Sequence, residues 1–398
     1  MARFTVEFLG CKVSHTDAQE IRERLSADGH AESEEGADVV VVNTCSVTHE
    51  AVRKSRRAAR RAARRAERVY VTGCAANLAG DGLAGLPENV VIVRLPSERT
   101  PAFVAADVGA LGCTRADVGL DRVRAFVKVQ DGCSFSCAFC VIPQVRGASR
   151  SRPATAVLDE VRRRAGQGHR EIVLTGINLG CYRDRDARFD LPRLVRAAGA
   201  IPGLERLRLS SIEVNHLGDD LLEALRSTPT VSAHLHVPLQ SGDDGVLRAM
   251  GRRYTAATYL RRLERAAGFN LTTDVIVGFP GEDEAAFERT VSVLRAAGIT
   301  KAHVFPYSPR PGTRTAASDT VPPGVKKERG ARLRTLSDEA CRRRWRDKIG
   351  TADTVLVDRP GRGYGDDYTP WLVQAPVGEL VRATAVDVSE EGVVGVPA

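Results

Sequence analysis

The stretch Cys133-Ser-Phe-Ser-Cys137-Ala-Phe-Cys140 places three cysteines within eight residues. This spacing lets one short loop turn three thiolates toward a single point, as a four-iron, four-sulfur (4Fe–4S) cluster requires. A cluster of this kind has four irons, and three local thiolates bind only three of them. The fourth iron is then open to a small molecule, and an open coordination position is typical of a catalytic metal rather than a structural one.

Two other uses of these cysteines fit the spacing less well. A zinc site needs a fourth Cys or His close by, but the nearest histidines in the sequence are His49 and His169. A disulfide would leave one of the three thiols unpaired. The motif therefore predicts a cluster that takes part in chemistry.

Length and composition indicate a globular protein with more than one domain. The chain has 398 residues, of which 43% are hydrophobic, enough for two or three domains. It contains no apolar run of membrane-spanning length and no signal peptide, so we expect a cytoplasmic protein without a membrane partner. Nine cysteines in such a chain favour metal or catalytic use over disulfides. The net charge of +8 is a modest indication of a polyanionic partner.

Residues 1–120 read as alternating strands and helices. Short runs rich in β-branched residues are separated by helical stretches, which predicts a parallel sheet covered by helices. We expect strands at 4–9, 39–43, 68–72 and 90–93, and helices at 17–28, 52–67 and 78–86.

Three further cysteines, Cys11, Cys45 and Cys74, each follow one of these expected strands, and Gly or Thr precedes each of them. In a parallel sheet the carboxyl ends of the strands meet at one edge, where ligands bind. The alternative is that each is an ordinary buried cysteine, a common fate for this residue. Because all three have the same placement, a second three-thiolate cluster is the favoured interpretation.

The rest of the chain reads as two further domains. Residues 121–348 contain about six strand–helix units, which predicts a partial (β/α)6 barrel of parallel strands, with the cysteine loop after the first strand. Residues 349–398 contain short strands joined by turns, which predicts a small antiparallel β-barrel. The fold class is therefore α/β, with domains expected at 1–120, 121–348 and 349–398.

Taken together, these motifs resemble the radical S-adenosylmethionine (SAM) methylthiotransferases, which attach a methylthio group to a substrate carbon. That family has an N-terminal cluster domain, a radical SAM barrel and a C-terminal TRAM barrel, so the resemblance covers almost the whole chain. It is carried by Lys128-Val-Gln-Asp-Gly-Cys133, Cys140-Val-Ile-Pro143 with Arg146-Gly147, Leu174-Thr-Gly-Ile-Asn-Leu-Gly180, Ser210-Ser-Ile-Glu213, His236-Val-Pro-Leu-Gln-Ser-Gly242, Asp274-Val-Ile-Val-Gly-Phe-Pro-Gly-Glu282 and Phe305-Pro-Tyr-Ser-Pro-Arg-Pro-Gly-Thr313.

Within the family, Gly10-Cys-Lys-Val13 and Thr175-Gly-Ile-Asn-Leu-Gly180 are most similar to the bacterial branch that acts on tRNA. The resemblance implies conversion of N6-threonylcarbamoyladenosine at position 37, beside the anticodon, to its 2-methylthio derivative. Ser14 and Gln144 depart from that branch, which usually has Asn and Tyr there. The alternatives are methylthiolation of a ribosomal-protein aspartate or of isopentenyladenosine in tRNA and, in another class, a non-catalytic RNA-binding iron–sulfur redox sensor.

The resemblance also implies the cofactors and the residues that hold them. Two 4Fe–4S clusters and SAM are expected, with no catalytic side chain beyond the cluster ligands. Cys133, Cys137 and Cys140 would hold the radical SAM cluster, and Cys11, Cys45 and Cys74 the auxiliary cluster. The residues expected to contact SAM are Phe139, Thr175, Gly176, Glu213, Gln240, Ile276 and Gly278.

The expected partners are a tRNA anticodon loop, a sulfur donor and an electron donor such as flavodoxin or ferredoxin. Cys113, Cys181 and Cys341 match no motif and read as spare thiols.

One helix carries the strongest basic pattern. Over residues 52–69, arginines fall on one half of the helix and mostly alanines on the other. A solvated charged face is the usual explanation, but the lone acid Glu67 leaves the like charges uncompensated, which favours contact with phosphates. The expected RNA contacts are Arg53, Arg57, Arg61 and Arg64.

The C-terminal segment has the opposite charge. Residues 351–398 contain eight acidic residues against three arginines, which does not suit a phosphate-binding barrel. Three explanations remain open: RNA recognition through Tyr364, Tyr368 and Trp371, a contribution from the nearby arginines at 342–346, or a mainly structural cap.

Overall fold

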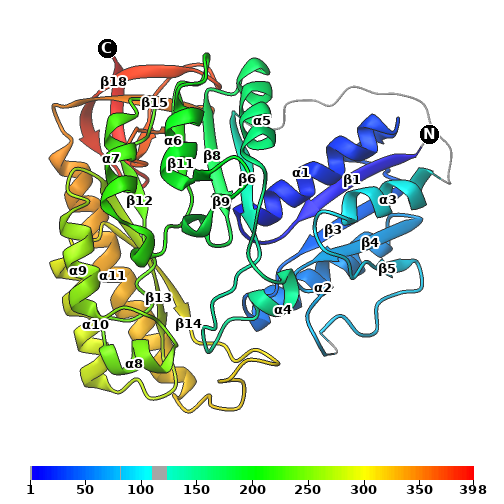
Figure 1. The fold of residues 1–398 in the computed structure, drawn as a ribbon, viewed down its shortest axis with the longest axis horizontal. Coiled ribbons are helices and arrows are strands. Elements are labelled where there is room, and N and C mark those ends of the chain that lie inside the picture. Colours follow the sequence, from blue (N-terminus) through cyan, green and yellow to red (C-terminus); the bar gives the residue numbers. More distant parts are fainter. Residues whose placement is uncertain (1, 81, 110–122) are drawn as a thin grey trace. The chain divides into compact units, whose positions relative to one another are not determined.

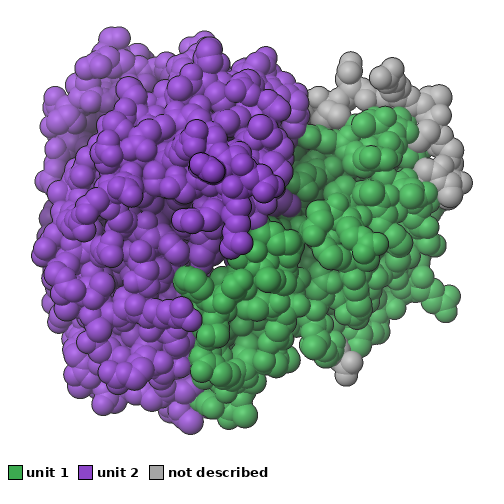
Figure 2. Space-filling model, in the orientation of Figure 1, with its two compact units in different colours: residues 1–120, 131–150, 308–318 green, residues 121–130, 151–307, 319–398 purple. Residues whose placement is uncertain are grey.

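The computed structural model describes residues 2–80, 82–109 and 123–398. The chain forms two compact units (Figure 2). Unit 1 comprises Met1–Leu120, Asp131–Arg150 and Ser308–Ser318, and unit 2 comprises Asp121–Gln130, Ser151–Tyr307 and Asp319–Ala398. The expected domain boundary after residue 120 and the spare thiol of Cys113 lie outside the described residues. The division into three domains stays a prediction.

Unit 1 is built on a five-stranded sheet in the order β2-β1-β3-β4-β5, in which every neighbouring pair is parallel. The sequence predicted the four longer strands and missed the two-residue β2. The strands are β1 (Arg3–Phe8), β2 (Ala31–Glu32), β3 (Val39–Thr44), β4 (Arg68–Gly73) and β5 (Val90–Ile92).

Helices cover both faces of this sheet (Figure 1). Successive side chains of a strand point to opposite faces, and β3 shows the result. Val39 and Val41 pack with apolar residues of α1 (Lys12–Ala27) and α3 (Thr100–Gly109), whereas Val40 and Val42 pack with the alanines of α2 (His49–Ala63). A run of four valines is therefore buried on both sides, as expected for a central strand of a parallel sheet.

The prediction of a helix at 78–86 is wrong, because the described residues of this stretch form bends and turns. Gly80 and Gly85 adopt φ angles of 96° and 65°, a left-handed conformation that cannot continue an α-helix. The sequence did not predict α3, which follows β5 instead. Unit 1 also includes α4 (Ile142–Arg146), which begins two residues after Cys140.

Unit 2 contains the six expected parallel strands. β6, β8 and β11 pair in one sheet and β12, β13 and β14 in another, and hydrogen bonds from β11 and the residues after it reach the β12 region. The result is the partial (β/α)6 barrel that the sequence predicted. The strands are β6 (Arg124–Asp131, whose last residue belongs to unit 1), β8 (Glu171–Gly176), β11 (Arg206–Leu209), β12 (His234–His236), β13 (Asn270–Val277) and β14 (Lys301–Pro306).

The helices between and after these strands are α5 (Ala154–Gly166), α6 (Leu191–Gly199), α7 (Asp219–Ser227), α8 (Asp244–Ala249), α9 (Ala256–Glu264), α10 (Glu284–Ala296) and α11 (Pro323–Asp347). The remaining short elements are β7 (Arg150–Ser151), β9 (Arg183–Asp184), β10 (Phe189–Asp190), η1 (Leu179–Cys181) and η2 (Val214–His216). Within the described part of the chain, no helix has the length and apolar character needed to cross a membrane.

The C-terminal residues of unit 2 close into a five-stranded barrel in the order β15-β16-β17-β19-β18. Its pairs are antiparallel, as predicted, except that β17 and β19 run parallel. Trp371 is 1% exposed and fills the barrel core, so it is not a surface group that could read RNA. The strands are β15 (Ala352–Arg359), β16 (Arg362–Tyr364), β17 (Pro370–Leu372), β18 (Leu380–Val388) and β19 (Val393–Pro397).

Several of the barrel's acidic residues bind groups of unit 2 itself. Asp366 accepts a hydrogen bond from the backbone N–H of Ala233, and Asp367 pairs with Arg344 at 2.7 Å and with Lys348 at 3.0 Å. The other two candidate aromatics, Tyr364 and Tyr368, are partly buried rather than core residues. The rings of Tyr364 and Tyr368 stack at 4.8 Å beneath nearby guanidinium groups. These contacts favour the structural-cap explanation of the acidic segment.

Where the C-terminal barrel contacts the central strands of unit 2, a buried carboxylate lies at the amino ends of those strands. Glu171, the first residue of β8, is 0% exposed and pairs with Arg124 at 3.1 Å, Arg206 at 3.3 Å and Arg208 at 3.1 Å. Burial alone raises the pKa of Glu171, but Arg208 and Arg124 outweigh it and lower that pKa to about 2. Arg206 also donates to the backbone oxygen of Thr354, which ties the C-terminal barrel to this cluster.

We expect Glu171→Gln to lower the free energy of unfolding by about 3–5 kcal/mol, because the buried Arg206 and Arg208 and the partly buried Arg124 lose their shared counter-charge. Urea denaturation at pH 7 measures this loss. The folded pKa lies below the unfolded one, so the stabilisation is complete above about pH 5 and disappears as the pH falls toward 2. The matched control is Glu205→Gln, which removes a carboxylate from an exposed pair with Arg170. Equal urea midpoints for the two variants would contradict the prediction.

Candidate functional site

Cys11, Cys45 and Cys74 lie at one edge of the unit 1 sheet. Cys11 occupies the position before the first residue of α1, three residues after β1, and Cys45 and Cys74 directly follow β3 and β4. These three strands are neighbours and run parallel, so their carboxyl ends meet at the same edge. A Cβ atom built on Gly10 would lie 3.2 Å from the Cβ of Cys45, which shows how closely the first two loops approach.

The three thiols also affect one another electrostatically. Burial, together with the nearby charges of Cys11 and Cys45, raises the pKa of Cys74 to about 12, although Arg146 acts in the opposite direction. Burial likewise raises the pKa of Cys45, and Cys11 acts in the same direction. Thiolates at this edge therefore need a positively charged group beside them, and bound iron ions are such a group.

Hydrogen bonds from polar side chains connect the loops that carry these cysteines. The Thr44 hydroxyl donates to the Thr72 backbone oxygen at 2.5 Å and accepts from the Ala75 N–H at 3.2 Å, so it bridges the loops of Cys45 and Cys74. The side-chain amide of Asn43 donates to the backbone oxygen of Ser14 at 2.8 Å. Gly73 has a φ of 88°, and a Cβ there would lie 2.2 Å from the Asn43 side chain, so glycine is required before Cys74.

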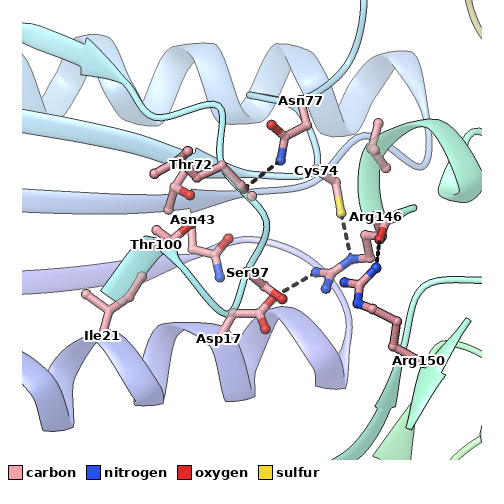
Figure 3. A pocket seen from close by; sticks show the side chains of 13 residues that line it. Asp17, Ile21, Asn43, Thr72, Cys74, Asn77, Ser97, Thr100, Arg146 and Arg150 are labelled. Carbon is pink, nitrogen blue, oxygen red and sulfur yellow. Dashed lines mark hydrogen bonds and ion pairs between the residues drawn. The ribbon is translucent and has the colours of Figure 1, made fainter. Parts of the chain in front are cut away.

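Arg146 lies against this edge of the sheet and lines a cavity of unit 1 (Figure 3). Its side chain is 5% exposed, and its Nε–H donates to the sulfur of Cys74 at 3.1 Å. The motif that contains Arg146 was recognised in the sequence, but the contact with Cys74, 72 positions away, was not.

Arg310 is a second buried arginine near these thiols. It is 2% exposed, and within the described part of the chain its Nε and Nη1 atoms have no hydrogen-bond partner. Burial lowers the pKa of Arg310, and the charge of Cys45 opposes that effect. A buried guanidinium with unsatisfied N–H groups is costly, so this position suits an anionic group beside Cys45. The only sequence signal for Arg310 was its place in the proline-rich motif.

The second cysteine triad lies in the loop after β6, in the 131–150 segment of unit 1. The N–H of Cys133 donates to the Gly147 oxygen at 3.0 Å, and the hydroxyl of Thr315 donates to the Ala138 oxygen at 3.1 Å. Gly132 has a φ of 67°, and a Cβ there would lie 2.1 Å from the Ala148 oxygen. All three cysteines, and Phe139 between them, are partly exposed.

Each triad fits a 4Fe–4S cluster by its donor set. Within residues 2–80, 82–109 and 123–398, no group of three or more His, Cys, Asp and Glu side chains is arranged to hold a metal ion. Each triad nevertheless offers three thiols, the donor type that iron–sulfur clusters use. The unsatisfied N–H groups of Arg310 add a positive charge near Cys45, which suits a cluster with a net negative charge.

Five of the other residues expected to contact SAM lie at the carboxyl ends of the central strands in unit 2, and the sixth, Ile276, lies near the end of β13. This edge is where barrels of parallel strands place their active sites. Gly176 ends β8, and Gly278, with a φ of 71°, follows β13. A Cβ on Gly278 would lie 2.3 Å from the Lys326 side chain. The remaining residues of the set are Thr175 in β8, Glu213 after β11, and Gln240 after β12.

The basic helix α2 has the two faces that the sequence predicted. Ala58, Ala59 and Ala62 are buried in the core of unit 1, and the four candidate arginines are exposed. Arg53 pairs with Glu50 and Arg61 with Glu7. Among the described residues, Arg57 and Arg64 have no acidic partner. These two are therefore the most available for an external anion.

The other two spare cysteines belong to neither triad. The sulfur of Cys181 lies 3.4 Å from Nε2 of His216, and the thiol of Cys341 donates to the Thr300 oxygen at 3.0 Å.

Comparison with known proteins covers both units. Residues 127–294 match the radical SAM superfamily, and residues 3–94 match the uncharacterized protein family UPF0004. A threonylcarbamoyladenosine tRNA methylthiotransferase MtaB of Thermotoga maritima is 32% identical over 99% of this chain and 96% of its own length. A tRNA-2-methylthio-N(6)-dimethylallyladenosine synthase of Cereibacter sphaeroides is 36% identical over 95% of this chain and 94% of its own.

Among solved structures, the radical SAM methyltransferase TsrM from Kitasatospora setae aligns with a TM-score of 0.59 and 15% identity, over 79% of this chain and 77% of that one. At this identity the likeness concerns the fold alone. The near-full-length relatives are methylthiotransferases, and the radical SAM match includes the cysteine loop. The chain belongs to the radical SAM methylthiotransferase family, whose enzymes use SAM and a 4Fe–4S cluster.

Proposed function

We propose that this enzyme is a tRNA methylthiotransferase that converts N6-threonylcarbamoyladenosine at position 37 to its 2-methylthio derivative, using two 4Fe–4S clusters. The observation that carries the proposal is the gathering of Cys11, Cys45 and Cys74 at one sheet edge, in the same unit as the Cys133–Cys140 loop. The substrate is supported by the near-full-length similarity to MtaB proteins of two bacteria.

In this proposal the protein's residues bind and orient, and the cofactors supply the reactivity. Removing the hydrogen at C2 of adenine is beyond acid–base groups at neutral pH, so a cluster-bound SAM supplies the radical chemistry. Cys133, Cys137 and Cys140 would hold that cluster and leave one iron open. Cys11, Cys45 and Cys74 would hold the auxiliary cluster, which would supply the binding position for the transferred sulfur.

The residues at the strand ends of unit 2 would orient SAM. The loop of Thr175 and Gly176 is the proposed site of the methionine amino group, and Ile276 and Gly278 would line the adenine. Glu213 and Gln240 are proposed to contact the methionine or ribose part, with Phe139 beside the cluster.

A second candidate substrate is isopentenyladenosine in tRNA, because relatives named for the dimethylallyl reaction are as similar as the MtaB proteins. The proposal of a tRNA substrate over a basic ribosomal-protein partner is supported by the contacts of the acidic C-terminal segment. The acidic C-terminal segment suggested that partner, and Asp366 and Asp367 of this segment bind within unit 2.

The deciding experiment is anaerobic reconstitution with iron and sulfide, followed by turnover on bulk tRNA from a strain that lacks this gene. With SAM and a reductant, we expect mass spectrometry of the nucleosides to show a methylthio derivative of N6-threonylcarbamoyladenosine. The protein should bind about eight irons, falling to about four when Cys11, Cys45 and Cys74 are replaced by alanine. That variant should still cleave SAM to 5′-deoxyadenosine.

Each other result removes a defined part of the proposal. A methylthio derivative of isopentenyladenosine alone would replace the first substrate with the second. Formation of 5′-deoxyadenosine without any changed nucleoside would overturn both tRNA substrates. An iron content that the three alanine substitutions leave unchanged would overturn the auxiliary cluster.

We further propose that the exposed face of α2 binds the phosphates of the tRNA. Arg53, Arg57 and Arg61 lie on that face and Arg64 is the C-cap residue of the helix, and the free charges of Arg57 and Arg64 support this role. Binding of phosphates releases counterions, so each contact contributes to the salt dependence of the affinity.

We expect the combined change of Arg57, Arg61 and Arg64 to glutamine to weaken tRNA binding several-fold and to reduce the log–log salt slope by roughly 2. Filter binding over a series of salt concentrations measures both quantities. The control replaces Arg248, Arg261 and Arg265, exposed arginines of unit 2, and so removes the same charge elsewhere. If both triple variants change affinity and slope equally, the effect is one of net charge and the assignment to α2 is wrong.

A further inference from the structure

Arg146 connects the segment of one cysteine triad to a member of the other. It ends helix α4, six positions after Cys140, and its guanidinium reaches the sulfur of Cys74. All of these residues belong to unit 1. The charged end of a side chain from the radical SAM segment therefore lies directly against a proposed ligand of the auxiliary cluster.

The three nitrogens of this guanidinium have separate partners, as the dashed contacts in Figure 3 partly show. Nη2 donates to Asp17 at 2.8 Å, Nη1 donates to Asp131 at 3.1 Å, and Nε donates to Cys74 at 3.1 Å. Nη1 reaches both oxygens of Asp131 at 3.1 Å, and the hydroxyl of Ser97 donates to Oδ2 of the same carboxylate at 2.7 Å. The two carboxylates fix the plane of the guanidinium, and the third donor is thereby aimed at sulfur.

Burial makes this contact strong. The side chains of Arg146 and Asp17 are 5% and 7% exposed, so water screens their charges little. Burial alone lowers the pKa of Arg146, but Asp17, Cys74 and Asp131 raise it, which keeps the guanidinium charged. Hydrogen bonds to ligand sulfurs and nearby charge are among the factors that set the potential of an iron–sulfur cluster.

We propose that Arg146 is a positioning residue of the auxiliary cluster, which orients the Cys74 sulfur and raises the reduction potential of that cluster through its Nε–H···S hydrogen bond. Asp17 has the opposing effect, because its carboxylate partly neutralises the same guanidinium. This inference rests on the auxiliary cluster of the proposed function.

The test measures the potential of the auxiliary cluster alone. In the full-length chain, Cys133, Cys137 and Cys140 are replaced by alanine, which removes the first cluster, and the remaining cluster is titrated anaerobically by electron paramagnetic resonance. Arg146→Gln removes the charge, and Arg146→Lys keeps the charge but loses the planar set of donors. The matched control is Arg150→Gln. Arg150 lines the same cavity and donates to backbone oxygens of residues 146 and 148 and to Glu98.

We expect Arg146→Gln to shift the potential downward, Arg146→Lys to shift it less, and Arg150→Gln to leave it unchanged. Asp17→Asn should shift it upward, because it frees positive charge for the sulfur. A merely structural role for Arg146 would not shift the reduction potential in opposite directions in the Arg146→Gln and Asp17→Asn variants. If Arg146→Gln does not fold, the result for Asp17→Asn decides.

Two results would overturn the inference, and they are distinguishable. If the auxiliary cluster binds normally and its potential is the same in the Arg146 and Asp17 variants, Arg146 does not act on the cluster, and the proposed function stands. If the parent with the three alanine substitutions binds no iron, the auxiliary cluster itself is wrong and the inference falls with it.

Discussion

The meeting of three parallel strand ends is the constraint on which the proposed chemistry depends. β1, β3 and β4 are neighbours in the unit 1 sheet, and a cysteine follows each of them within three residues. The valines of β3 hold this arrangement, because they are buried on both faces of the sheet between helices. Burial of the strand core thus fixes the positions of the thiols, and Cys74 itself belongs to this core.

Positive charge at the same edge makes a cluster of thiolates tolerable. Thiolates are costly to bury unless cations or donors lie beside them. Arg146 supplies a hydrogen bond to Cys74, and Arg310 brings a buried guanidinium with unsatisfied N–H groups near Cys45. The carboxylates of Asp17 and Asp131 bind Arg146. Among the described residues, Nε and Nη1 of Arg310 have no hydrogen-bond partner. The two arginines therefore differ in how much positive charge they offer to a bound group.

In unit 2, the amino ends of the central strands use charge for a structural purpose. Glu171 and its three arginines lie at the amino ends of the strands, and the C-terminal barrel adds Asp366, Asp367 and two stacked tyrosines to this region. The acidic C-terminal segment, which looked unsuited to an RNA-binding protein, is partly neutralised by partners within unit 2. Its composition therefore does not argue against a nucleic-acid substrate bound elsewhere on the protein.

The sequence by itself determined the features that depend on local pattern. Strand periodicity, the Cys133–Cys140 spacing and the Ala/Arg division of α2 are readable from neighbouring residues, and the structure agrees with the strands and with the buried alanines. A local pattern also misled, because glycines at positive φ turn residues 78–86 away from the expected helix. Only the tertiary structure decided which distant groups meet. The contact of Arg146 with Cys74 and the four-residue ion cluster at Glu171 join residues 35 or more positions apart, and hydrogen bonds across such separations leave no periodicity in the sequence.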